Sequence, residues 1–99
     1  MKSLVDLVGM KHRGTEAFVA SLPQGEPLTL IRDRDNRFDP WAVQVWARGQ
    51  HVAFLKATQV RPIALALDAK GSDNPLTAPT AEAKLAIDGG RWPMAELDL

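Results

Sequence analysis

The chain has 99 residues, with twelve basic and twelve acidic residues and no cysteine. A chain of this length forms one small domain, and its 45% hydrophobic and 24% charged residues are typical of globular proteins. The lack of cysteine excludes disulfides, thiolate catalysis and cysteine-ligated metals. The formal net charge of zero argues against strong non-specific attraction to duplex DNA.

The distribution of apolar and charged residues adds two expectations. The chain begins without an apolar run of signal-peptide length, and no 18 apolar residues occur together, so we expect a cytoplasmic protein. Residues 1–56 carry eight Lys or Arg and six Asp or Glu. This part of the chain can therefore present a modestly basic face.

The first third of the chain predicts a strand, a short helix and a second strand. A short apolar run over residues 3–10 predicts the first strand, which a basic turn at residues 11–14 ends. Residues 15–22 predict a short helix, with Thr15 as its N-cap and Phe18 packed inward. The apolar run at residues 28–31 predicts the second strand.

The middle of the chain predicts a hairpin followed by a helix. Residues 42–46 and 50–55 alternate as strands, joined by a three-residue turn in which Gly49 supplies a positive φ. Residues 59–69 predict a helix with Pro62 in its first turn and Gly71 after its end. Its apolar face contains Val60, Ile63, Ala64 and Leu67.

The last third predicts a loop and two strands. Residues 71–79 have loop composition, residues 81–87 alternate as a strand, and residues 88–90 turn the chain. Residues 92–99 alternate weakly, so we expect an edge strand there. The chain is thus mostly β (α+β), with about six strands and one or two short helices.

Charged and aromatic residues are most concentrated in residues 32–45, which contain three arginines, three aspartates, Phe38 and Trp41. One interpretation is a solvated connection whose charges neutralise one another. The other is a nucleic-acid site, because aromatic rings beside basic residues suit stacking on bases next to phosphates. Composition alone leaves both open.

Catalysis is not expected. Asp33, Asp35 and Asp39 are the nearest candidates for a metal-dependent nuclease, but the interleaved arginines oppose cation binding. His12 and His51 lie in no metal-ligand motif. We predict neither a cofactor nor a metal.

The segment resembles the HIRAN domain pattern R-x-x-x-N-x-[aromatic]-D-x-x-A-[I/V]-x-V without a gap. The matching residues are Arg32, Asn36, Phe38, Asp39, Ala42, Val43 and Val45. Residues 7–12, 25–30 and 49–55 resemble the family's opening strand, its G-[D/E]-P-L-x-L lead-in and its G-x-x-[I/V]-G-[aromatic]-[L/V] strand. The resemblance covers roughly residues 5–70. Four positions depart from the family's usual residues. Trp41 stands where the family usually has Asn, and Ala53 stands where it usually has Gly. Phe54 stands where Tyr or His is frequent, and Arg37 stands where Pro is frequent.

The resemblance implies that residues 1–99 form a small OB/SH3-like β-barrel that binds DNA and captures the 3′-hydroxyl end of a single strand. It also implies a setting in DNA repair or replication-fork processing, beside helicase or nuclease partners. The nucleic-acid-binding residues that we expect from it are Lys11, His12, Arg32, Asn36, Phe38, Asp39, Trp41, Phe54 and Lys56.

Two alternatives stay open at this stage. Asp39 either accepts a hydrogen bond from the 3′-hydroxyl or only forms an Asx-turn before Trp41 or an ion pair with Arg37. The whole protein either binds DNA or is a protein-interaction or dimerisation module that uses Trp41, Trp46 and Trp92 as apolar anchors.

Overall fold

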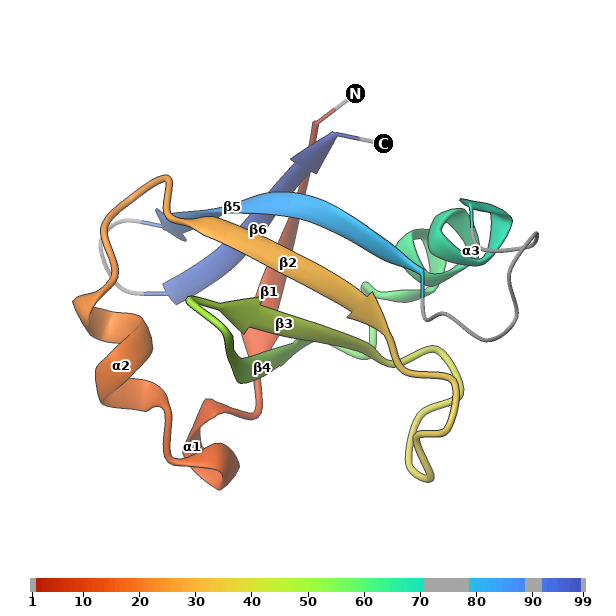
Figure 1. Cartoon of the computed structure of the whole chain (residues 1–99), viewed down its shortest axis with the longest axis horizontal. Coiled ribbons are helices and arrows are strands. Elements are labelled where there is room, and N and C mark those ends of the chain that lie inside the picture. Colours follow the sequence, from red (N-terminus) through yellow and green to blue (C-terminus); the bar gives the residue numbers. More distant parts are fainter. Residues whose placement is uncertain (1, 71–78, 89–91, 99) are drawn as a thin grey trace.

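The computed structural model describes residues 2–70, 79–88 and 92–98, and six antiparallel strands form its body (Figure 1). The strand order β1-β4-β3-β2-β5-β6 closes into a barrel, so the prediction of a small, mostly β barrel is confirmed. The strands are β1 (Lys2–Val8), β2 (Pro27–Arg32), β3 (Val43–Ala47), β4 (Gln50–Leu55), β5 (Thr80–Asp88) and β6 (Trp92–Asp98).

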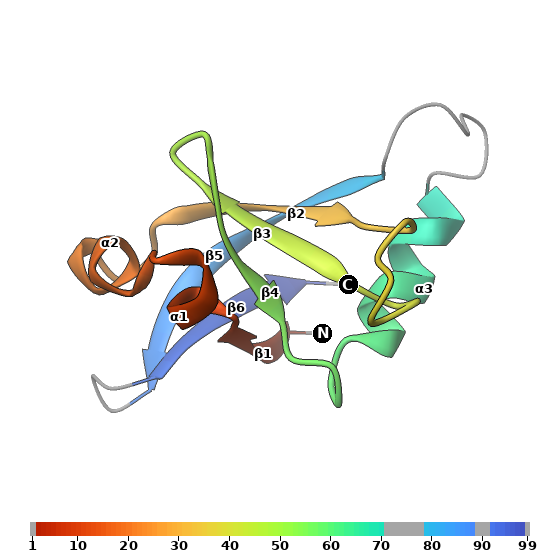
Figure 2. The ribbon, with the colours of Figure 1, turned by 90° about the horizontal axis from the view of Figure 1, so that it is seen from below.

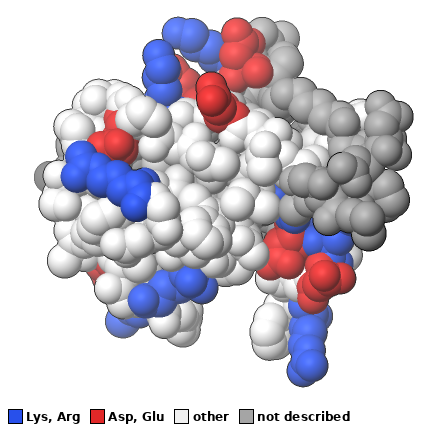
Figure 3. Space-filling view, viewed as in Figure 1, with Lys and Arg blue, Asp and Glu red and all other residues white. Residues whose placement is uncertain are grey.

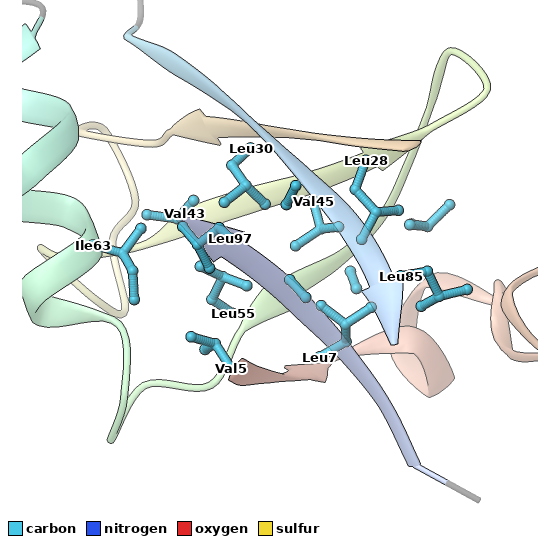
Figure 4. Packing of buried hydrophobic residues seen from close by; sticks show 14 of the residues in the cluster. Val5, Leu7, Leu28, Leu30, Val43, Val45, Leu55, Ile63, Leu85 and Leu97 are labelled. Atoms are coloured by element: carbon cyan, nitrogen blue, oxygen red, sulfur yellow. The ribbon is translucent and has the colours of Figure 1, made fainter. Parts of the chain in front are cut away.

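The barrel interior is filled by the apolar half of each alternating strand. In β2 the buried positions are Leu28, Leu30 and Arg32, and in β3 they are Val43, Val45 and Ala47. Side chains from β1, β4, β5 and β6 meet them inside the barrel (Figure 4). The strand with the least regular alternation is β4, whose Val52 and Ala53 are both buried.

Three short helices cover the two ends of the barrel: α1 (Met10–Arg13), α2 (Glu16–Ser21) and α3 (Arg61–Lys70). The figure places α1 and α2 together at one end and α3 at the other (Figure 1). The apolar face predicted for α3 joins the core through Ile63, Ala64 and Leu67. In the described part of the chain, every helix is too short to cross a bilayer.

The N-terminal helical region differs from the prediction in two details. The basic segment after β1 forms the single turn α1, because Gly9 and Gly14 on either side of it adopt φ values of 83° and 69°. Thr15 is the N-cap of α2, as predicted, but its hydroxyl donates to the carbonyl of Val52 instead of capping the helix. Phe18 is half-buried against the core.

The expectation that the last strand lies at a sheet edge was wrong. β6 pairs with β5 on one side and with β1 on the other, from Lys2↔Asp98 to Asp6↔Met94. Barrel closure gives the terminal strands each other as partners and so removes their exposed edges.

The hairpin between β3 and β4 is confirmed, with a shorter turn than predicted. Arg48 and Gly49 have φ values of 51° and 78°, and positive φ at both central residues is the hallmark of a type I′ turn. The predicted helix stop at Gly71 lies outside the described residues, as do the predicted loop at residues 71–79 except Pro79 and the predicted turn at residues 88–90 except Asp88.

Candidate functional site

The β2–β3 loop (residues 33–42) projects from the barrel and is braced by its own side chains. Asn36 Oδ1 accepts hydrogen bonds from the backbone N–H groups of Phe38 and Asp39, at 2.9 and 3.0 Å. Asp39 Oδ1 accepts a 2.9 Å hydrogen bond from the backbone N–H of Trp41, which forms the Asx-turn that was one of the two alternatives for Asp39. These bonds fix the backbone on both sides of Phe38.

Arg32 holds the base of this loop from inside the barrel. The residue is only 5% exposed, and its guanidinium donates to the carbonyl oxygens of Asp33, Pro40 and Ala42 and to both carboxylate oxygens of Asp68. All five guanidinium N–H groups are thereby used. We assign Arg32 to bracing the loop, because its guanidinium has no free donor left for the nucleic-acid contact expected of it.

Asp68, on α3, ties the loop to the helix. Its Oδ1 lies 3.1 Å from Arg32 Nε and 3.1 Å from Arg34 Nη2, so one carboxylate pairs with two arginines. The loop and α3 are accordingly side by side in the second view (Figure 2). Sequence reasoning missed Asp68, although it is the lone acidic residue of the predicted helix.

Phe38 is a large apolar residue of the loop that the fold does not use. Its side chain is 95% exposed, although the backbone around it is held by Asn36. The loop carries side chains of both charge signs and stands clear of the barrel in the space-filling view (Figure 3). A large apolar ring is therefore presented to solvent on a backbone that is already ordered.

The outer face of β3 and β4 carries an aromatic strip formed by Trp46, His51 and Phe54. The Trp46 and His51 rings are stacked, with centroids 5.6 Å apart and an interplanar angle of 9°. The Phe54 ring meets His51 edge-on at 4.8 Å. Trp46 thus lies on the outer face of its strand with Gln44, in agreement with the alternation of β3.

A β-bulge brings the two rings of β4 to the same face. Val45 pairs with Ala53 but Trp46 pairs with His51, so β4 has one extra residue between these pairs. His51 and Phe54 are three positions apart and would face opposite sides of a regular strand. Sequence reasoning named Phe54 and missed His51 and Trp46 as parts of this surface. His51 could not be placed there, because periodicity does not reveal a bulge.

Hydrogen bonds connect the aromatic strip to the β2–β3 loop. The Trp46 indole N–H donates to Gln44 Oε1 at 2.9 Å, and Gln44 Nε2 donates to Asp33 Oδ2 at 3.1 Å. Asn36 Nδ2 donates to the same oxygen of Asp33 at 3.3 Å. The loop and the strip therefore form one continuous, ordered surface.

The other end of the strip reaches α1. Arg13 Nε donates to the carbonyl of His51 at 3.0 Å, and a β-carbon at Gly9 would lie 3.6 Å from Phe54 Cδ2. The predicted residues Lys11 and His12 are exposed on α1. In both ribbon views α1 and the β2–β3 loop lie apart, with β4 between them (Figures 1 and 2).

The remaining predicted residues, Lys56 and Trp41, have neighbours on β1 and α3. Lys56 follows β4 and lies 3.7 Å from Asp6, with its side chain 47% exposed. Trp41 is half-buried, packs against the core and has the guanidinium groups of Arg32 and Arg61 over its ring, at 5.7 and 5.0 Å. The predicted residues thus lie on α1, at the end of β2, on the β2–β3 loop and on or just after β4, instead of meeting at one point.

The three tryptophans do not form a common patch. Trp41 lies beside α3, Trp46 lies on the aromatic strip, and Trp92, which is 48% exposed, borders a groove with α1 and α2. Each ring has different neighbours, so the fold does not gather them as a set of apolar anchors.

Comparisons with protein-family models, curated proteins and solved structures found no match to this chain. Within residues 2–70, 79–88 and 92–98, no three histidine or acidic side chains are grouped closely enough to hold a metal ion. Asp33 and Asp39, which the sequence offers as metal ligands, instead accept hydrogen bonds from Asn36, Gln44 and the Trp41 N–H. The site therefore consists of aromatic, amide and basic groups together with carboxylates that accept hydrogen bonds from them or from the backbone.

His51 makes the stability of this surface depend on pH. Burial lowers the pKa of the imidazole below its ordinary value of 6.5, and the nearby Arg13 cation lowers it further. The hydrogen bond with the Ala53 carbonyl and the charge of Asp33 oppose this shift without reversing it. A lowered pKa means that the unfolded chain takes up this proton before the folded protein does. Folding stability is therefore lost as pH falls below about 6.5.

We expect an NMR titration to show His51 with a midpoint below 6.5 and the melting temperature to fall between pH 7.5 and 5.5. The variant His12→Gln leaves one histidine and so assigns the resonance. The variant His51→Phe, which keeps a ring but cannot titrate, should remove part of the pH dependence of melting. A midpoint at or above 6.5 would contradict this account.

Proposed function

We propose that this protein is a HIRAN-type DNA-binding module that captures the 3′-hydroxyl end of a single DNA strand. The observation that carries the proposal is Phe38, whose ring is 95% exposed on a loop braced by Arg32, Asn36 and Asp39. A ring that stays in water adds little to folding stability, whereas stacking of a base on that ring adds to the free energy of binding. The loop is ordered before any ligand arrives, so binding does not have to order it.

Asp39 supports recognition of an end. Its Oδ1 is used by the Trp41 N–H, whereas Oδ2 accepts no hydrogen bond from the described residues. A carboxylate repels phosphate but accepts a hydrogen bond from a hydroxyl group. The Asx-turn and a contact to a 3′-hydroxyl use different oxygens, so the two roles first posed as alternatives are compatible.

The aromatic strip supports a path for the rest of the strand. Trp46, His51 and Phe54 give aromatic surface beside the loop, and Lys11 and His12 lie beyond them on α1. Aromatic rings beside cations are the usual composition of a single-strand path. The HIRAN resemblance favours the same surface and a setting in DNA repair or fork processing, beside a helicase or nuclease partner.

The ligand preference can be measured by fluorescence anisotropy with three probes: a short single strand, its 3′-phosphorylated version and a blunt duplex. We expect tightest binding of the free 3′-hydroxyl strand, because a 3′-phosphate adds negative charge beside Asp39 and the bases of a duplex are already paired and stacked on one another. Equal binding of all three probes, or none at low salt, would refute the proposal.

Phe38→Ala should weaken binding of the single strand by about 1–3 kcal/mol, the usual contribution of one base stacked on a ring. Its melting temperature should stay close to that of the parent, because the ring makes little contact with the fold. Leu4→Ala is the matched control, since Leu4 is 53% exposed on β1, and should change neither quantity. Unchanged affinity in Phe38→Ala would remove stacking from the mechanism.

Asp39→Asn should abolish discrimination between 3′-hydroxyl and 3′-phosphate ends. The amide oxygen can still accept the Trp41 N–H, so the turn persists, while repulsion of the terminal phosphate disappears. The control is Asp35→Asn, an exposed loop carboxylate of equal charge, which should retain discrimination. If Asp39→Asn folds and discriminates like the parent, Asp39 serves the turn alone.

A further inference from the structure

Two arginines contact Trp41 from the loop and α3 sides of the molecule, and their hydrogen bonds differ. Arg32 donates all of its guanidinium N–H groups to carbonyl oxygens and to Asp68. The guanidinium of Arg61 lies 5.0 Å from the Trp41 ring centre. It makes no hydrogen bond or ion pair to the residues that the structure describes. One guanidinium is saturated, and the other is exposed with all its donors available.

The orientation of Arg61 is set by a ring that is itself fixed. The Trp41 ring packs against the core, and the backbone N–H of Trp41 donates a hydrogen bond to Asp39 Oδ1. A guanidinium over an aromatic face keeps its N–H edges free, because the ring uses its flat side. Arg61 is therefore a positioned cation without a carboxylate partner, next to the loop that carries Phe38.

Neighbouring acidic side chains leave the guanidinium of Arg61 free to contact a phosphate on the α3 side. Arg34 shares Asp68 with Arg32 and is only 40% exposed, so part of its donor capacity is used. Lys56 has Asp6 at 3.7 Å. Arginine binds phosphate through paired N–H groups, and Arg61 can offer such a pair without first breaking another contact.

We propose that Arg61 and Trp41 form a second contact for the bound strand, in which Arg61 binds an internucleotide phosphate close to the base on Phe38. This inference rests on the proposed DNA-binding function and deepens it, because it adds a binding residue on α3 that the family pattern does not contain. The strand is then held on both sides of Phe38, by the aromatic strip on one side and by Arg61 on the other.

The test is the salt dependence of single-strand binding for the parent, Arg61→Gln, Arg61→Lys and the control Lys84→Gln. Each phosphate contact on a single strand contributes about 0.7 to the slope of log K against log salt. Arg61→Gln should lower the slope by about 0.7 and weaken binding about tenfold at low salt. Arg61→Lys should keep most of the slope, and Lys84→Gln, on the exposed face of β5, should match the parent.

The outcomes separate this inference from the function on which it rests. If the parent binds the strand and Arg61→Gln keeps the parent's slope, Arg61 only covers Trp41 and the inference is wrong, while the proposed function stands. If the parent fails to bind any single strand at low salt, the proposed function is wrong and the inference fails with it. Arg61→Gln should still distinguish 3′-hydroxyl from 3′-phosphate ends, because that choice belongs to Asp39.

Discussion

The arrangement of the candidate site depends on the buried guanidinium of Arg32. A charge that is 5% exposed is tolerated only when it is paired and its donors are satisfied, and here three loop carbonyls and the Asp68 carboxylate do both. The same bonds close the loop at its base and join it to α3. Removing one partner of such a buried pair typically costs about 3–5 kcal/mol, so the loop shape is tied to folding of the barrel.

The residues of the HIRAN-like pattern have different roles in this arrangement. Arg32, Asn36 and Asp39 each make hydrogen bonds that shape the loop, and Val43 and Val45 fill the core. Phe38 alone has neither role. A match to a sequence pattern therefore does not by itself mean that every matching residue contacts a ligand. Most of these side chains instead fill the core or hold the loop so that the Phe38 ring and one carboxylate oxygen of Asp39 are presented to solvent.

The strands and the hairpin could be predicted because alternation and Gly49 are local signals. Three features could not be. The bulge that turns His51 outward depends on the register between β3 and β4. The pairing of β6 with β1 joins residues at opposite ends of the chain. The counter-charge of Arg32 is Asp68, 36 positions away, so the sequence could show a basic residue in a candidate site but not that its donors were already used.

The balance of charge decides what kind of binding this surface can support. A chain with no formal net charge lacks the uncompensated positive field that drives tight non-specific binding. Two of its arginines are held by one carboxylate, and a lysine lies beside another. If the proposed function is correct, affinity for a strand must then come from a few positioned contacts, chiefly stacking on Phe38 and a hydrogen bond to Asp39. Under the same proposal, low net charge favours discrimination between ends, because it limits the non-specific attraction that any stretch of DNA backbone would share.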